Sequence, residues 1–370
     1  MTSPKPSPSS RPASPPVAAR SRGAPPPEAR ERWPADAWDD PLLVIRLSSL
    51  GDVLLTSGPL RLLSGRRPQL LIRVLTQDRF APLLRGLPFV HEVAAVESAI
   101  APLPARTVCD WQGGLRGWRA LRRYAPHARS VRYPTAALHR RLRVLGGSRV
   151  PAVEPYVVRL ARSIAGRPIA LSALTPQTEL GRAEHPGLAA RLERSGHPER
   201  GWLVTGPGAS RPLKAVPEAL ISQIEACLQQ RGWGVVRLMA PSASQGAGGA
   251  AAGVFWREPS PGRLEVRATL PHVAALLRCA SLFVGSDSGI LHMATAIGVP
   301  AIGLFGPTAP SLGFSPLGNA TAVGVELACR PCHVHGPRRC WLGHRRCWRE
   351  LSVDRVLSAV ARLRPEPPTS

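Results

Sequence analysis

The sequence predicts an α/β protein with two doubly wound halves that face each other across a cleft. From residue 42 onwards, short apolar runs alternate with amphipathic stretches, and this series occurs twice. The apolar runs do not alternate with polar residues, which indicates parallel sheets covered by helices on both faces. Ligands of such folds bind beyond the carboxyl ends of the strands, so the turns there are the expected functional segments.

The first half is expected to span residues 41–163. It opens with the run LLVIRL and a Ser-Ser-Leu-Gly-Asp turn, and further strands are expected in QLLIRVLT, VHEVAAV and ARTVCDWQ. The last of these leads through a glycine turn into the basic helix GGLRGWRALRRY. Residues 1–40 are rich in Pro, Ser and Arg and contain no apolar run of the kind found in signal peptides. They are predicted to be a disordered extension.

The second half is expected to span residues 164–350, with the boundary near Ser163. Strands are expected in GWLVTG, GVVRLMA, SLFVGS and VPAIGLFG. Helices are expected in VPEALISQIEACLQQ, LPHVAALLRCA and ILHMATAIG, which have helical apolar spacing. Residues 351–370 are predicted to form a C-terminal helix and tail.

The chain is strongly basic, with a formal net charge of +24. Only Lys5 and Lys214 among its 48 Lys and Arg residues are lysines. The charge has two interpretations, a chain-wide arginine bias or an acidic partner such as a phosphorylated lipid or a nucleotide. Aromatic residues make up 5% of the chain and no nucleic-acid-binding module is present, which argues against nucleic acid.

Two strand ends carry the residue types that bind phosphate and sugar. The segment GPGASRPLK places Ser210 and Lys214 after a glycine loop. In VGSDSGILHMATAIG, Asp287 ends a buried strand, Ser288 and Gly289 start a helix, and His292 follows on its first turn. Structural roles are the alternatives, namely an ordinary loop, an N-cap at Asp287 and a core histidine.

Taken together and in this order, RLSSLGDVLLTSGPLRLL, CDWQGGLRG, GPGASRPLKAVPEAL and VGSDSGILHMATAIGVPAIGLFGPTAP resemble the ADP-heptose:lipopolysaccharide heptosyltransferase family. That family has the GT-B fold, and its members are inverting glycosyltransferases. The resemblance covers roughly residues 41–360. It implies that the first half binds the acceptor and the second half binds the nucleotide sugar.

The resemblance also implies residue roles. Asp52 matches the proposed general base, which takes the proton of the attacking hydroxyl. The positions on the acceptor side are Ser49, Gly51, Gln112 and Arg116. The positions on the donor side are Ser210, Lys214, Asp287, Ser288, Gly289 and His292. Lys214 and a helix N-terminus would stabilise the leaving diphosphate, so that catalysis needs no cofactor.

One segment departs from the family pattern. After GVVRLMA, family members often carry an acidic residue that holds the ribose, whereas this chain reads PSASQGAGGAAAG and has no carboxylate before Glu258. Within this segment, Gly246-x-Gly248-x-x-Ala251 is a loose dinucleotide fingerprint that begins several residues beyond the strand. We interpret it as a Gly/Ala loop.

Four cysteines near the C-terminus have the spacing C-x2-C-x7-C-x6-C, with histidines between them. The four cysteines are Cys329, Cys332, Cys340 and Cys347. Thiolates at such spacing bind zinc or iron tetrahedrally, and some family members with similar clusters bind iron. The predicted site is structural. The alternative is a set of reduced thiols in a packed loop.

The function predicted from the resemblance is transfer of heptose, or a related sugar, from ADP-heptose to an acidic lipid A-core acceptor. The arginine-rich segments LRGWRALRRY and LHRRLRVLGGSRV are expected to contact acceptor phosphates or the anionic inner membrane. The expected location is cytoplasmic, on the inner face of that membrane. One alternative is a protein O-heptosyltransferase or another family member with a different donor or acceptor. The alternative that is not an enzyme is a basic nucleic-acid-binding protein.

Overall fold

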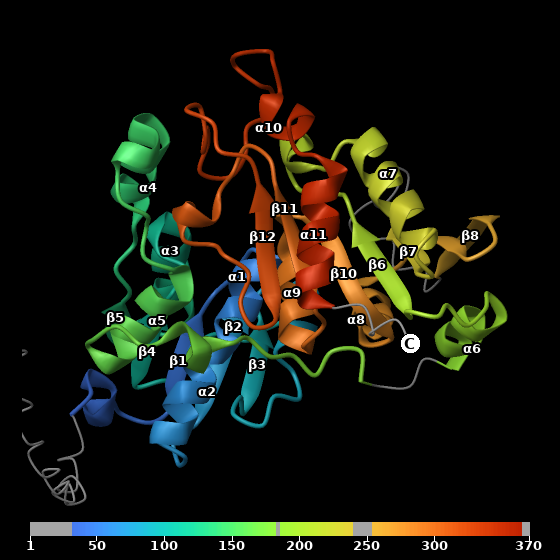
Figure 1. The fold of residues 1–370 in the computed structure, drawn as a ribbon. Helices are drawn as coiled ribbons and strands as arrows, with labels where there is room; N and C mark the ends of the chain where they lie inside the picture. The colour runs from blue at the N-terminus through green and yellow to red at the C-terminus, as the bar shows by residue number, and fades with distance from the viewer. Residues whose placement is uncertain (1–31, 183–185, 240–253, 365–370) are drawn as a thin grey trace, which may run out of the picture. The chain divides into compact units, whose positions relative to one another are not determined.

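Two sheets organise the described part of the chain in this computed structural model (Figure 1). The structure describes residues 32–182, 186–239 and 254–364. The first sheet has five parallel strands in the order β3-β2-β1-β4-β5. Their bounds are Leu42–Ile45 (β1), Ile72–Thr76 (β2), Glu92–Ala95 (β3), Thr107–Asp110 (β4) and Arg129–Arg132 (β5).

The second sheet has seven strands in the order β12-β11-β10-β6-β7-β9-β8. All of its neighbouring strands pair in parallel except β8, which forms an antiparallel hairpin with β9 at the edge. Their bounds are Trp202–Gly206 (β6), Gly234–Leu238 (β7), Phe255–Ser260 (β8), Arg263–Arg267 (β9), Ala280–Ser286 (β10), Ala301–Phe305 (β11) and Ala320–Gly324 (β12).

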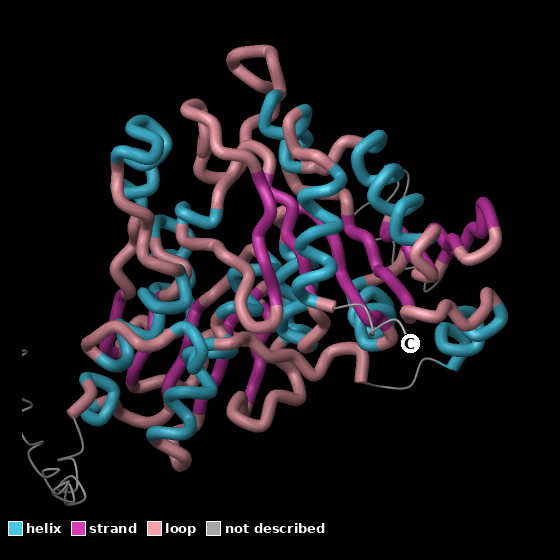
Figure 2. The backbone as a smooth tube through the Cα atoms, in the orientation of Figure 1, coloured by secondary structure: helices cyan, strands magenta, loops and turns pink. Residues whose placement is uncertain are grey.

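Both faces of the central strands are buried, which explains their unbroken apolar sequences. In β1, Leu42 and Val44 join one hydrophobic cluster, whereas Leu43 and Ile45 join another on the opposite face. Successive side chains of a strand point to opposite faces, so each cluster takes every second residue. Helices supply the other side of these clusters, and Figure 2 shows them in cyan around the magenta strands.

The helices that position the site begin at the ends of the central strands. The α-helices of the first half are Leu50–Leu55 (α1), Ser57–Arg66 (α2), Gly114–Tyr124 (α3), Ala137–Gly146 (α4) and Tyr156–Ala165 (α5). Those that follow are Pro186–Arg194 (α6), Glu218–Gln229 (α7), Leu270–Arg278 (α8), Gly289–Ile297 (α9), Arg346–Arg349 (α10) and Val353–Leu363 (α11). The 3-10 helices are Pro34–Ala37 (η1), Asp78–Leu83 (η2), Gly147–Arg149 (η3), Leu171–Leu174 (η4), Pro212–Lys214 (η5) and Pro310–Leu312 (η6).

The predicted α/β fold with two doubly wound sheets is confirmed. The sequence interpretation missed polar or short elements, above all the edge strands β5, β8 and β12 and the helix α5. Ser163 lies inside α5, whose apolar residues pack on α2 and η1 of the first half. A boundary at Ser163 would therefore cut a helix. Residues 33–370 form one compact unit, and the division into two separately acting domains stays a prediction.

The predicted disordered extension is too long at its C-terminal end. Residues 33–39 are ordered against the first half, because two tryptophans and an ion pair hold them there. Trp38 is 3% exposed, and a salt bridge of 2.7 Å joins Asp36 to Arg66. This contact lowers the pKa of Asp36 to about 2, chiefly through the hydrogen bond from Arg66. Residues 1–31 lie outside the described residues.

Within the described ranges, no helix is long and apolar enough to cross a membrane. The segment that contains Gly246, Gly248 and Ala251 lies outside the described residues. Glu258 lies on β8 at the sheet edge and pairs with Arg191 at 2.7 Å.

Candidate active site

The predicted site residues gather at the strand ends where the chain changes direction in each sheet. The first sheet changes direction between β1 and β4, and the second between β6 and β10. Crevices at such switch points are where open α/β sheets bind ligands. The turns that follow β1 and β10 lead into α1 and α9, and these two helices pack against each other.

The two helices meet at their N-termini through glycines. A Cβ atom at Gly51 would lie 2.7 Å from Cδ2 of His292, and one at Gly289 would lie 2.6 Å from Cδ2 of Leu50. Side chains at either position would therefore force α1 and α9 apart. Because Gly51 and Gly289 have no side chains, the predicted acceptor and donor turns can lie in contact.

Asp52 is held at the first turn of α1 as an ionised carboxylate. Its Oδ2 atom accepts hydrogen bonds from Ser49, from N at 3.0 Å and from Oγ at 2.9 Å. The same oxygen lies 2.7 Å from Nη2 of Arg46. Burial by itself raises the pKa of Asp52, but the Arg46 charge and the Ser49 hydrogen bonds outweigh it and hold this pKa below its usual range.

The surroundings of Arg46 were not anticipated from the sequence. Its guanidinium lies 5.1 Å from the ring centroid of Tyr156, and its Nη1 donates to the carbonyl of Trp111 at 2.6 Å. Tyr156 stacks on Phe314, over which Arg140 also lies. These contacts join segments that lie 65 or more residues apart in the sequence, and no local motif announces them.

The other acceptor-side predictions have different outcomes. Oε1 of Gln112 accepts from the backbone N atoms of Leu47 at 3.0 Å and Ser48 at 3.3 Å. Gln112 therefore ties the end of β4 to the turn that presents Asp52. Arg116 lies on an exposed part of α3, and the structure shows no bond between it and the Asp52 carboxylate.

On the donor side, Lys214 and Asp287 form an ion pair. Nζ of Lys214 lies 2.8 Å from Oδ2 of Asp287, and Thr308 Oγ1 donates to the same oxygen at 2.6 Å. Thr308 is a further site residue that sequence reasoning missed. Ser288 is the N-cap of α9, and its buried Oγ has no partner among the described residues. Ser210 is exposed on the glycine loop.

His292 connects the two sides. It is 5% exposed, and its Nδ1 has no hydrogen-bond partner in the described part of the chain. Burial lowers the pKa of His292, against the opposing pull of the Asp287 and Asp52 carboxylates. The imidazole is therefore neutral near pH 7, and it lies within the electrostatic reach of Asp52, Asp287 and Lys214.

The metal site predicted at the four cysteines stays a prediction. Within the described ranges, no group of three or more His, Cys, Asp or Glu side chains is arranged to hold a metal ion. The four cysteines are free thiols, and Sγ of Cys329 lies 3.9 Å from Nε2 of His344. Burial raises the pKa of Cys332, and that of Cys347 to about 11, whereas backbone hydrogen bonds lower the pKa of Cys340.

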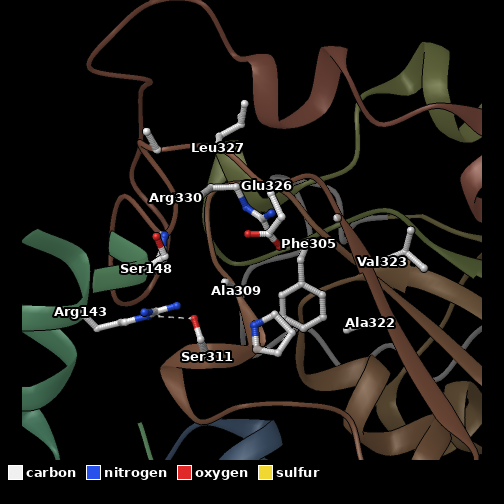
Figure 3. A pocket seen from close by; sticks show the side chains of 14 residues that line it. Arg143, Ser148, Phe305, Ala309, Ser311, Ala322, Val323, Glu326, Leu327 and Arg330 are labelled. Carbon is white, nitrogen blue, oxygen red and sulfur yellow. Dashed lines mark hydrogen bonds between the residues drawn. The ribbon is translucent and has the colours of Figure 1, made fainter. Parts of the chain in front are cut away.

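A cavity of about 640 Å³ lies between α4 and the ends of β11 and β12 (Figure 3). Arg143 reaches towards it from α4 and donates to Ser311 Oγ at 3.3 Å, while Glu326 and Arg330 line it from the other side. None of the predicted site residues lines this cavity. It is separate from the turns that carry Asp52 and Lys214.

The model of glycosyltransferase family 9 (heptosyltransferase) matches residues 125–340, more than half of the chain. The chain belongs to glycosyltransferase family 9. This finding confirms the resemblance drawn from the motifs, and it makes the chain a glycosyltransferase. The match begins in the first half and ends in the cysteine-rich segment, so it includes all of the predicted donor side.

Relatives and solved structures support the same family and fold. Lipopolysaccharide heptosyltransferase 1 of Pseudomonas aeruginosa is 27% identical over 323 residues, 79% of this chain and 85% of that protein. The E. coli ADP-heptose LPS heptosyltransferase II structure has a TM-score of 0.57 at 20% identity, covering 87% of this chain and 98% of that one. The E. coli heptosyltransferase WaaC with ADP has a TM-score of 0.54 at 17% identity, covering 87% and 97%. The GT-B fold of this family 9 chain is thereby confirmed.

Proposed function

We propose that the chain is an inverting heptosyltransferase that uses ADP-heptose as donor and the inner core of lipopolysaccharide as acceptor. The observation that carries this proposal is the contact between α1 and α9, which sets Asp52 opposite the Lys214–Asp287 pair. Two of the similar proteins are named as lipopolysaccharide heptosyltransferases, and a third is a heptosyltransferase structure with ADP. These names support the choice of substrates.

In the proposed step, the oxygen of an acceptor hydroxyl attacks the anomeric carbon of the donor sugar. Asp52 accepts the hydroxyl proton as the new glycosidic bond forms. The bond from the anomeric carbon to the phosphate oxygen breaks, and its electron pair leaves with the nucleoside diphosphate. A single displacement of this kind inverts the anomeric configuration.

The donor side stabilises the charge that develops on the leaving diphosphate. Lys214 provides a positive charge, and the amides at the start of α9 point their N–H groups towards the same region. Because these groups supply positive potential, the proposed step does not require a cofactor. The neutral His292 contributes hydrogen-bonding capacity at the meeting point of the two substrates.

Incubation with a panel of nucleotide sugars, with and without lipid A-core acceptors, tests the proposal through nucleoside diphosphate release. We expect release from ADP-heptose in the presence of the lipid acceptor, and a product of inverted anomeric configuration by NMR. Transfer from another nucleotide sugar, or to a protein hydroxyl, would contradict the assigned substrates. Retention of configuration would contradict the single displacement.

Asp52→Asn is the matched variant for the mechanism. It keeps the size of the side chain and removes its basicity, so we expect transfer to fall about 10² to 10⁴-fold while ADP binding stays nearly unchanged. Steady-state rates and calorimetric ADP binding measure the two effects. Activity within a few-fold of the unmodified protein would exclude Asp52 as the base.

We further propose that α3 and α4 contact the anionic inner face of the inner membrane, which would place the enzyme on the cytoplasmic side. The exposed apolar residues of the two helices are Leu115, Trp118, Leu138, Leu142 and Leu145. Arginines flank them, and α4 buries none of its residues. Apolar side chains among cationic ones suit a surface of anionic lipid.

Sedimentation with vesicles of phosphatidylglycerol and phosphatidylethanolamine tests this surface. We expect binding that weakens with added salt, and a several-fold loss with Leu138→Asp combined with Leu145→Asp, which are 70% and 84% exposed. Phe255→Asp, on the edge strand β8 and 57% exposed, is the control. Equal binding by all three proteins would contradict the proposed surface.

A further inference from the structure

The cysteine-rich segment, residues 329–348, forms a strap that is fixed at both ends beside the donor site. At one end, Arg330 donates to the carbonyl of Thr308 at 2.8 Å and the backbone N of Cys332 donates to that of Pro307 at 3.0 Å. At the other end, Nε1 of Trp348 donates to the carbonyl of Leu213 at 2.7 Å. The two anchoring points adjoin Thr308 and Lys214, which both contact Asp287.

The middle of the strap lies directly against Lys214. Gly336 is buried, has a φ of +78° and sits so close that an added Cβ would overlap Cγ and Cδ of Lys214. The lysine cannot easily move aside, because its Nζ is paired with Asp287. A glycine is therefore required here both for the backbone conformation and for the contact.

His335, the neighbour of Gly336, is exposed next to the same group of charges. Partial burial lowers the pKa of His335, and the charges of Arg140, Asp52 and Lys214 all act on its ring. His335 directly precedes Gly336, so its backbone lies beside the contact between Gly336 and the proposed phosphate-binding lysine. His333 differs, because its Nδ1 accepts a hydrogen bond from the backbone of His335 at 2.9 Å.

We infer that His335 and Gly336 form one wall of the donor site, in which Gly336 holds Lys214 in place and His335 contacts the bound nucleoside diphosphate sugar. This inference rests on the proposed function and adds to it two donor-binding residues from a segment that the site motifs do not include. It also assigns a role to the strap that depends on its backbone path and not on its thiols.

Gly336→Ala and Gly343→Ala form a matched pair for the contact with Lys214. Both glycines belong to the strap and have positive φ, +78° and +70°, but nothing lies within 4 Å of a Cβ at Gly343. The two variants share the conformational cost of alanine, and only Gly336→Ala displaces Lys214. Acetylation by an amine-reactive reagent, followed peptide by peptide by mass spectrometry, reports this displacement, and Lys5 normalises the dose of reagent.

We expect Lys214 to react several-fold faster in Gly336→Ala than in the unmodified protein, and at an unchanged rate in Gly343→Ala. The same rate in all three proteins would overturn the contact. This measurement needs no bound substrate, so it decides the position of the strap even if the protein binds no nucleotide.

His335→Ala and His127→Ala form the second pair, with ADP as the probe. A hydrogen bond to a charged group corresponds to about a tenfold change in affinity, which is the loss expected for His335→Ala. His127 is exposed on the loop that follows α3, so His127→Ala is expected to bind ADP like the unmodified protein. Equal affinities of both variants and the unmodified protein would overturn the role of His335, whereas absence of ADP binding by the unmodified protein would overturn the proposed donor.

Discussion

The charge on Asp52 depends chiefly on Arg46, and the hydrogen bonds from Ser49 add to its effect. The guanidinium lies 2.7 Å from the carboxylate and is itself 9% exposed at the side chain, so water screens the pair weakly. The pair has an opposite effect on each partner, since Asp52 raises the pKa of Arg46 while Arg46 lowers that of Asp52. Arg46 thus controls the pH at which the proposed base loses its charge.

The pH dependence of transfer tests this role. Because its pKa lies below the usual range of an aspartate, Asp52 is expected to stay ionised down to the ordinary aspartate pKa, and the acid limb of the rate is expected below it. Arg46→Met leaves only the Ser49 hydrogen bonds to oppose burial, which raises the pKa of Asp52 and moves the acid limb to higher pH. The measurement is the pH profile of the transfer rate. Arg129→Met, at an exposed position of β5, is expected to leave the profile in place.

An unchanged acid limb in Arg46→Met would assign that limb to a group other than Asp52.

The positions of the site residues in the structure show why some of them could be predicted from the sequence and others not. Asp52, Lys214 and Asp287 lie in local motifs that follow strands, so the sequence marks them. Arg46 and Thr308 act through partners that are distant in sequence or unmarked by a motif, and only the folded chain brings them to the carboxylates.

At the level of elements, the strands with two buried faces could be predicted and the edge strands could not. The sequence of β1 is Leu-Leu-Val-Ile, whereas β5 is Arg-Ser-Val-Arg and has one face and one edge in water. A polar edge strand has no hydrophobic pattern to recognise, and its pairing depends on the register with its neighbour. The strap was missed for a similar reason, because its path depends on anchors elsewhere in the fold.

In the second half of the chain, a buried ion pair joins Arg237 of β7 to Glu225 of α7. Arg237 and Glu225 are 3% and 2% exposed, and Nη2 of Arg237 donates to Glu225 Oε2 at 2.6 Å. Thr205 on β6 donates to the other oxygen of this carboxylate, also at 2.6 Å. The pair therefore links two strands and a helix directly behind the donor loop.

Removal of Arg237 leaves a carboxylate buried without its main partner. We expect Arg237→Met to lower the free energy of unfolding by about 3 to 5 kcal/mol, as measured by urea denaturation. Arg257→Met removes an arginine that is 65% exposed and lies 3.4 Å from Glu265, and it is expected to cost at most about 1 kcal/mol. Similar losses in the two variants would show that the buried pair contributes no more to the free energy of unfolding than the pair of Arg257 does.

At the level of the whole molecule, the compact unit begins at Trp33. Two truncated chains test this boundary, one that begins just before Trp33 and one that begins a few residues after it. A chain that begins at Arg32 keeps η1, Trp38 and the Asp36–Arg66 pair, and we expect its free energy of unfolding to match that of the full chain. A chain that begins at Asp40 loses a buried tryptophan, and removal of such a side chain costs about 3 to 5 kcal/mol.

Urea denaturation of the two truncated chains measures this difference. Equal stability of both would mean that residues 33–39 contribute nothing to the fold, despite the hydrogen bonds that Arg67 donates to the carbonyls of Ala35 and Trp38. A loss of stability already in the chain that begins at Arg32 would show that the compact unit starts earlier.

The outer surfaces of α3 and α4 carry arginine and no lysine. A guanidinium keeps its proton at every pH that a cell experiences, whereas an ammonium can be neutralised by acylation. Enzymes that acetylate lysine therefore have no target on these two helices. A shift towards alkaline pH does not neutralise their arginines. The proposed attraction of this face to a bilayer would then respond to ionic strength and to the proportion of anionic lipid, while the charges of its arginines stay constant.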